Sequence, residues 1–131
     1  MLAPALRNVS LWPFDGSLPS LLSPGKVVVA ETFPAECYGW FSKDPLGSKR
    51  SQDNRKKFGT SLLSWAETQK VAIDGGLREE IEDGFSQGDD AFDAVVGVFG
   101  MLKVCLGERA TGEPEEQVIR DIEGWILGRD A

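Results

Sequence analysis

The feature that most constrains the fold of this chain is a strand pattern that leads directly into a helix pattern. Residues 26–33 (KVVVAETF) indicate a strand, and the consecutive β-branched residues Val27–Val29 are typical of a strand buried on both faces. Residues 34–41 then indicate a helix, because Pro34 fits the first helical position. Burial on both faces requires helices packed on a mostly parallel sheet. The sequence therefore predicts an α/β fold that is rich in helix and has a sheet of few strands.

Hydrophobic periodicity and turn residues predict the remaining elements. We expect a short strand around Trp12, helices over residues 18–22, 53–71, 77–85, 91–106 and 114–121, and a tail, 122–127, that packs back. The 91–106 segment is apolar nearly all round, which predicts a helix buried in the middle of the protein. Gly97 and Gly100 leave flat spots on this helix where another element can approach closely.

Length and composition bound the class of protein. A chain of 131 residues supports one domain, 1–131, in which residues 1–10 are expected to be weakly structured. The chain holds 14 Lys and Arg against 21 Asp and Glu, and this net charge of −7 argues against a protein that coats nucleic acid. No apolar run is long enough to cross a bilayer and no signal peptide pattern is present, so we expect a cytoplasmic protein without membrane contact.

The absence of histidine narrows the chemistry that the chain can perform. Without histidine there is no Ser-His-Asp triad, no Cys-His pair and no His-ligated zinc site. The two cysteines, Cys37 and Cys105, indicate neither a disulfide framework nor a four-thiolate zinc site, and we expect both to be small core residues. The chemistry that remains is that of carboxylates, with or without a hard ion such as Mg²⁺ or Mn²⁺.

Three acids, Glu31, Asp90 and Asp93, stand at positions that usually avoid acids. By alternation Glu31 shares a face of the predicted strand with two of its valines, and Asp90 and Asp93 project from the same side of the predicted helix. Converging carboxylates repel one another unless a cation lies between them, and a divalent metal removes that cost. Two-metal phosphoryl transfer requires a cluster of this kind.

These acids also have structural interpretations, which the pattern alone slightly favours. Asp-x-x-Asp at a helix start resembles a capping arrangement, and Glu31 at a strand end can face solvent. The one basic cluster also has two interpretations. It fits a phosphate-contacting edge or, more simply, a solvated loop and helix start. That cluster consists of Lys49, Arg50, Arg55, Lys56 and Lys57.

Three segments carry a resemblance to a known family. VVVAETFPAECYGWF, GDDAFDAVVGVFGML and EGWILGR, in this order and spacing, resemble the C-terminal part of a family of uncharacterised prokaryotic proteins classed as predicted ribonuclease H-like nucleases. The resemblance runs from about Leu11 to Arg129 and so covers nearly the whole chain. It implies a ribonuclease H-like α/β fold, with a mixed sheet flanked by helices, and metal-dependent hydrolysis of phosphodiesters.

The resemblance also implies which acids bind metal. The acid of a later strand maps onto Glu31, and the acids at the start of the final core helix map onto Asp90 and Asp93. These would be the catalytic residues and the ligands of Mg²⁺ or Mn²⁺. The family commonly has a His-Asp pair at that helix start, where this chain has Asp89-Asp90, so Asp89 becomes a further candidate ligand.

The N-terminus departs from the family pattern. The superfamily opens with three strands, the first of which carries an aspartate, and residues 1–10 are too short to supply them. This chain therefore resembles the C-terminal half of the fold, a part or remnant that we do not expect to be active alone. Unpaired sheet edges recruit other chains, so we expect a homodimer or a separate N-terminal half as partner, with nucleic acid as a possible substrate.

A second hypothesis belongs to a different class of protein. The chain can be a non-catalytic interaction or structural module that uses an open sheet edge or a Trp-bearing surface. It predicts that Glu31 lies far from Asp90 and Asp93, or that the carboxylates are satisfied by caps and arginines. The nuclease hypothesis instead predicts all three carboxylates within a few ångströms of one another. A carboxylate-pair glycosidase has no support beyond the acids themselves.

Overall fold

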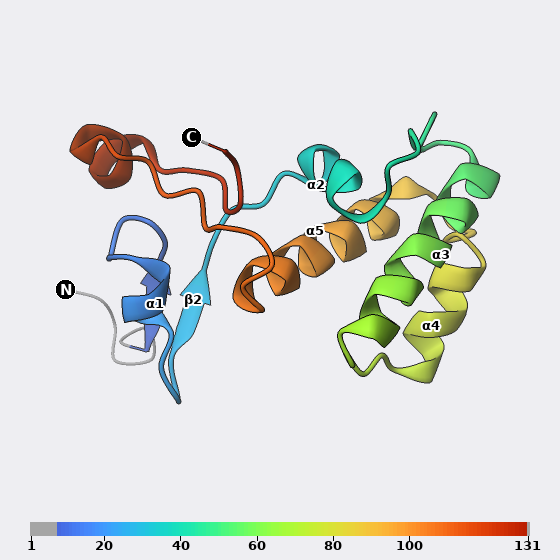
Figure 1. Cartoon of the computed structure of the whole chain (residues 1–131), viewed down its shortest axis with the longest axis horizontal. Coiled ribbons are helices and arrows are strands. Elements are labelled where there is room, and N and C mark those ends of the chain that lie inside the picture. The colour runs from blue at the N-terminus through green and yellow to red at the C-terminus, as the bar shows by residue number, and fades with distance from the viewer. Residues whose placement is uncertain (1–7, 131) are drawn as a thin grey trace. The chain divides into compact units, whose positions relative to one another are not determined.

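The computed structural model describes residues 8–130, which form two compact units (Figure 1). The helical unit is the continuous segment Pro34–Gly100. The terminal unit combines the two flanking segments, up to Phe33 and from Met101 onward. The single domain expected from the chain length stays a prediction, because two compact units can belong to one domain.

The terminal unit contains the small sheet of the protein. Strands β1 (Val9–Leu11) and β2 (Val27–Val29) pair in parallel, with Val9 opposite Val27 and Leu11 opposite Val29. The short helix α1 (Leu18–Leu21) lies between them in the sequence, and an isolated parallel bridge joins Glu31 to Ile126 of the C-terminal tail. The prediction of a helix-rich α/β protein with few, parallel strands is therefore confirmed for the described residues.

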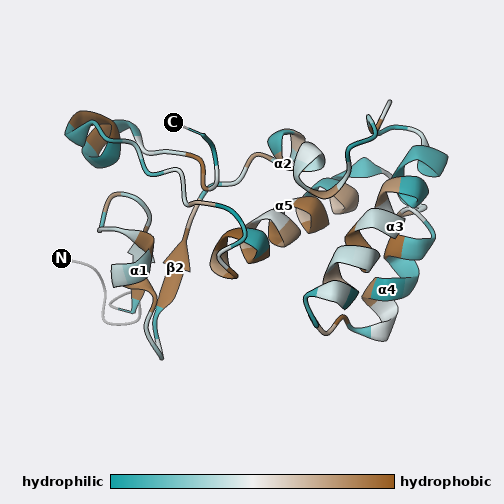
Figure 2. Cartoon of the chain, in the orientation of Figure 1, coloured by the Kyte–Doolittle hydropathy of each residue, from teal (hydrophilic) through white to brown (hydrophobic). Residues whose placement is uncertain are grey.

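The predicted burial of the valine strand on both faces is wrong. The side chains of Val27 and Val29 are 55% and 48% exposed, whereas Val28 packs against the core of the terminal unit. β2 is hydrophobic throughout (Figure 2), so its composition does not distinguish its two faces. In a sheet of two short strands, one face is covered and alternate residues point away from it, which explains the difference.

The helical unit is built from four helices with clear local signals. They are α2 (Pro34–Phe41), α3 (Gln52–Thr68), α4 (Gly75–Glu82) and the greater part of α5 (Asp89–Cys105). The Ser51 hydroxyl accepts a hydrogen bond from the Asn54 N–H and caps α3, and the Asp74 carboxylate caps α4 in the same way. All four helices were expected from the sequence, with ends that shift by a few residues.

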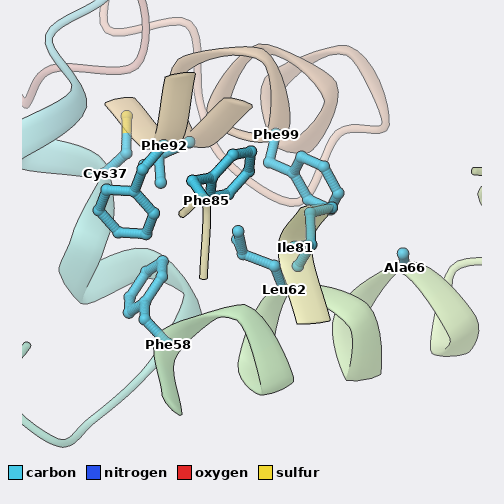
Figure 3. Close-up of a cluster of buried hydrophobic side chains, with 9 residues drawn as sticks. Cys37, Phe58, Leu62, Ala66, Ile81, Phe85, Phe92 and Phe99 are labelled. Carbon is cyan, nitrogen blue, oxygen red and sulfur yellow. The ribbon is translucent and has the colours of Figure 1, made fainter. Parts of the chain in front are cut away.

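The core of the helical unit is rich in aromatic side chains, which point toward one another in Figure 3. The Phe92 ring of α5 lies 5.7 Å from the ring of Phe58 in α3, 5.8 Å from that of Tyr38 in α2 and 6.1 Å from that of Phe85. α3 and α4 pack side by side (Figure 1), and Ile81 of α4 is fully buried. The buried residues are Cys37, Phe58, Leu62, Ala66, Ile81, Phe85, Phe92, Val96 and Phe99.

α5 is buried on one face only, which corrects the prediction of all-round burial. Phe92, Val96 and Phe99 are buried, but Val98 is 55% exposed and Cys105 is exposed as well. The prediction that Cys105 is a core residue is thus wrong, while Cys37 is buried as expected. A single layer of neighbouring helices covers one side of a helix, so an apolar composition alone overstates its burial.

The predicted flat spot at Gly100 is confirmed. A Cβ atom at this position would lie 2.7 Å from the Cys37 sulfur and 3.2 Å from the Trp40 ring. The absence of a side chain therefore lets α2 and α5 approach closely.

The C-terminal segment differs from the predicted helix. Helical backbone begins at Gln117 rather than Pro114 and passes into a π-helical turn, Ile119–Glu123. The tail partly packs back as expected, because Leu127 joins the terminal core together with Trp12, Leu18 and Val104, although Ile122 is exposed.

Two predictions concern the chain start and membranes. We expected residues 1–10 to be weakly structured. Residues 1–7 lie outside the described residues, whereas Val9 and Ser10 belong to strand β1. No helix in the described part of the chain is long and apolar enough to span a bilayer.

Candidate functional site

The candidate site lies in the helical unit, where the first two turns of α5 meet α2 and the loop 42–51. Asp89 and Asp90 occupy the first turn of α5, and Asp93 lies one turn further on. Asp89 and Asp93 are four residues apart, so their side chains share one face of the helix. Asp90 is exposed.

Asp93 is the centre of this site, because both of its carboxylate oxygens have a donor. The Tyr38 hydroxyl of α2 donates a hydrogen bond to Asp93 Oδ1 at 2.5 Å. The Lys49 ammonium of the loop pairs with Asp93 Oδ2 and also lies 3.8 Å from Asp89 Oδ2. The structure therefore joins Asp89 and Asp93 through one lysine. The binding of a metal ion by Asp90 and Asp93 together with Glu31 stays a prediction.

Tyr38 and Lys49 keep their protons well above neutral pH. Burial raises the pKa of Tyr38, and the hydrogen bond to Asp93 and the charge of that carboxylate raise it further. The hydrogen bond with Asp93 raises the pKa of Lys49. Near neutral pH the site thus holds an ammonium ion and a neutral phenol against two aspartates.

Arg55 holds the backbone of the loop that presents Lys49. This arginine is only 4% exposed, and its Nη1 donates hydrogen bonds to the carbonyls of Lys49 and Arg50 at 2.7 and 2.9 Å. Its Nε and Nη2 donate to the carbonyls of Gly84 and Phe85 at 2.7 and 3.0 Å. The predicted interpretation of Arg55 as a solvated or phosphate-contacting residue is therefore wrong: it joins two loops inside the unit.

The remaining members of the basic cluster follow the simpler interpretation. Arg50, Lys56 and Lys57 are exposed, as expected of a solvated loop and helix start. Lys49 is the exception, because its side chain is 44% exposed and pairs with two aspartates of α5.

Glu31 belongs to the terminal unit and not to the unit that holds Asp89, Asp90 and Asp93. Its side chain is exposed, and its backbone carbonyl accepts a hydrogen bond from the Leu127 N–H at 2.9 Å. The joint role of Glu31, Asp90 and Asp93 as catalytic residues therefore stays a prediction.

The donor set around Asp93 does not fit a Mg²⁺ or Mn²⁺ centre. Hard divalent ions require several oxygen ligands, whereas Asp93 contacts an ammonium group and a protonated phenol. Within residues 8–130, no group of three or more His, Cys, Asp or Glu side chains is placed to hold a metal ion. As they are arranged in this structure, these residues therefore do not form a metal centre.

Sequence reasoning did not assign Tyr38 or Lys49 to the site. Tyr38 is the single tyrosine of the chain and lies in a helix that the sequence predicts, but nothing local links it to an acid 55 residues away. Lys49 belongs to the one basic cluster, which was the only available signal, and the pairing of a lysine in a loop with a distant helix cannot be seen from spacing.

No family model, curated protein or solved structure matches this chain.

Proposed function

We propose that this chain is one part of a ribonuclease H-like, metal-dependent nuclease for phosphodiesters, and that it does not hydrolyse them alone. The observation that carries the proposal is the concentration of Asp89, Asp90 and Asp93 in the first two turns of α5, where the resemblance places metal-binding acids. A mixed α/β unit with a parallel strand pair is compatible with this class.

The cofactor in this proposal is Mg²⁺ or Mn²⁺, held by Glu31, Asp90 and Asp93 with Asp89 as a further ligand. Because the described residues do not gather these acids around a metal, the proposal requires a rearrangement and a further acid from another polypeptide. A second copy of the chain or a separate N-terminal half would supply that acid. Removing one ligand from such a centre removes most of its charge stabilisation, which is why the chain alone should be inactive.

Calorimetric titration with Mn²⁺ tests this proposal. We expect weak binding that Asp93→Asn reduces at least about tenfold. Asp53→Asn is the matched control, because Asp53 is an exposed acid in the first turn of α3. Titrations that are the same for wild type and Asp93→Asn would contradict the proposal. Labelled RNA and DNA incubated with Mn²⁺ and the chain alone should remain intact.

One observation favours the alternative, a non-catalytic interaction module. The carboxylate of Asp93 is already satisfied within the helical unit, by a lysine and a tyrosine rather than by the caps and arginines expected. In the terminal unit, the register places Leu11 opposite Val29, and these residues and Val27 are each about half exposed. This sheet face would contact the partner.

Light scattering during size-exclusion chromatography tests the alternative. We expect self-association that increases with concentration and that Val27→Lys weakens. Lys26→Met, a change next to the same strand but outside its apolar face, is the control. A chain that stays monomeric at high concentration would contradict self-association through this face.

A further inference from the structure

We propose that the outer edge of strand β2 binds β2 of a second copy of the chain in antiparallel orientation, so that the sheets of the two copies join into one. This dimer rests on the self-association put forward above for the interaction module, and it specifies the occupant, the strand edge and the register. The contact runs through the backbone of β2 and continues onto the apolar face of the sheet.

The backbone of β2 has one unpaired edge. The N–H of Val27 and the carbonyl of Val29 form hydrogen bonds of 2.7 and 2.9 Å with backbone groups that flank β1. Because successive residues of a strand direct their backbone groups to opposite sides, Val28 and Ala30 present theirs at the other edge. Within residues 8–130 the sheet has two strands, and no described residue forms a hydrogen bond with Val28 or Ala30 at that edge.

The outer edge of β1 is protected, in contrast to that of β2. The Asp15 carboxylate accepts a hydrogen bond from the Leu11 N–H at 2.7 Å, and the Asp15 N–H donates one to the Leu11 carbonyl at 2.9 Å. In the described part of the chain nothing does the same for β2, and residues 27–30 include neither a charge nor a proline. Unprotected edges of this kind recruit an extended strand, so the ligand that fits this edge is another β-strand.

The charges at the two ends of β2 favour β2 of a second copy as that strand. The exposed Lys26 precedes the strand and the exposed Glu31 follows it. Antiparallel pairing brings the positive end of one strand near the negative end of the other, whereas parallel pairing brings like charges together. Exposed charges of this kind select the direction of pairing and contribute little affinity.

One register pairs the free backbone groups and joins the apolar faces. When Val28 lies opposite Ala30 of the second copy, the N–H and carbonyl groups of both residues find partners in each copy. Val29 then lies opposite Val29 of the second copy, at the twofold axis. Leu11, Val27 and Val29, each about half exposed in one copy, form an apolar face that continues across this axis.

Disulfide trapping tests the register in a Cys105→Ser background, which removes the exposed thiol. We expect Val29→Cys to form an interchain disulfide under mild oxidation, because facing residues of this kind have Cα atoms about 4.5 Å apart. Val27→Cys is the matched control, since its two copies would be offset along the strands by on the order of 13 Å and should stay reduced. Non-reducing electrophoresis measures both. Trapping of Val29→Cys no stronger than that of Val27→Cys would overturn the register.

Ala30→Pro tests the edge itself, because proline removes an N–H that points away from β1 and is tolerated at such a position. We expect the dissociation constant of the dimer, measured by analytical ultracentrifugation, to rise at least about tenfold. Ala30→Ser keeps the N–H and should dimerise as the wild type does, and circular dichroism verifies that both variants are folded. Unchanged dimerisation of folded Ala30→Pro would overturn the edge contact and leave self-association through the sheet face intact. A wild type that stays monomeric at high concentration would overturn both.

Discussion

The helical unit and the terminal unit reach a buried core by different routes. The helical unit is one continuous segment whose nine buried core residues come from four helices and the adjoining loop. The terminal unit has four buried core residues, contributed by both ends of the chain. One of its hydrogen bonds, from the Trp12 indole to Glu113, joins residues 101 positions apart. Local sequence signals therefore determine the first unit, and long-range contacts determine the second.

The largest difference between the units should appear in their cores. Phe92→Ala leaves a large cavity in the helical unit, so we expect it to lower the free energy of unfolding by about 3–5 kcal/mol. Leu127→Ala in the smaller terminal core should cost about 2–3 kcal/mol. Denaturation in urea, followed by tryptophan fluorescence, measures both, and Val98→Ala on the exposed side of α5 is the control. A cost for Phe92→Ala no larger than that for Leu127→Ala would contradict the expected difference between the two cores.

The next effect concerns the buried polar anchor of the helical unit. Arg55→Met removes the donors of four backbone carbonyls, and we expect a loss of about 3 kcal/mol. Arg55→Lys should not restore stability, because a lysine cannot reproduce the planar fork of donors. Lys57→Met, an exposed change in the same helix, should be nearly neutral in the same urea denaturation. Equal stabilities of the Arg55 and Lys57 variants would show that the fork is dispensable.

The close approach of α2 and α5 can be tested with two glycine substitutions that should change the free energy of unfolding in opposite directions. Gly100→Ala forces a methyl group against the Cys37 sulfur, and we expect it to destabilise the chain by about 1–3 kcal/mol. Gly39→Ala meets no atom within 4 Å and should stabilise it by about 0.5–1 kcal/mol, because alanine favours a helix. Thermal unfolding of the two variants decides the point. Stability changes of the same sign in both variants would contradict the tight packing of α2 against α5 at Gly100.

The terminal unit has a polar anchor that should be weaker than Arg55. Glu113 accepts hydrogen bonds from the Trp12 indole at 3.3 Å and from the Leu18 N–H at 3.0 Å. We expect Glu113→Ala to cost about 1–2 kcal/mol and Glu113→Gln to cost less, because its amide oxygen can still accept. The exposed Glu115→Ala is the control in urea denaturation. A loss as large as that of Arg55→Met would remove the difference between the units.

The smallest expected effect is a pH dependence in alkaline solution. Tyr38 and Lys49 have pKa values raised above their ordinary 10.0 and 10.5, so both bind protons more tightly in the folded chain. Their stabilisation is therefore complete below about pH 10 and is lost as the pH rises through the folded values. The free energy of unfolding should fall across this range. The fall should be smaller in Asp93→Asn, since the shared hydrogen-bond partner loses its charge.

Tyrosinate absorbance isolates the Tyr38 contribution, because the chain has one tyrosine. In the folded state, we expect Asp93→Asn to lower the pKa of Tyr38 toward its ordinary value, although burial still holds it above that value. Asp90→Asn, a change to an exposed acid one turn earlier, should leave the pKa of Tyr38 unchanged. Identical curves for wild type and Asp93→Asn would show that the hydrogen bond has no influence in solution.

The sequence predicted the helices of the helical unit because their signals are local. Pro34 at a first helical position and the apolar spacing in α3 need no knowledge of the rest of the chain. Burial was predicted less well, because it depends on which neighbours are present. The half-exposed Val27 and Val29, the exposed Cys105 and the buried Arg55 all show this limit.

The candidate site was predicted in part. The acids at the start of α5 were recognised from a pattern that usually excludes acids, and two of them do share a cation. That cation is Lys49, and its position depends on the buried Arg55. The partners of Arg55 are backbone carbonyls, which every residue has, so the sequence does not indicate them. A charge pattern indicates where carboxylates gather but not which positive group neutralises them.

The split of the terminal unit has a consequence for synthesis on the ribosome. Residues 34–100 are synthesised before residues 101–130, so the chain of the helical unit is complete before that of the terminal unit. The apolar residues Trp12 and Leu18 meanwhile lack Val104 and Leu127, which are synthesised later and complete their core. Although domains generally fold in N-terminal order, here the segment that holds Trp12 and Leu18 is covered later than the segment that follows it in the sequence. It is the stretch of the nascent chain that we expect chaperones to bind.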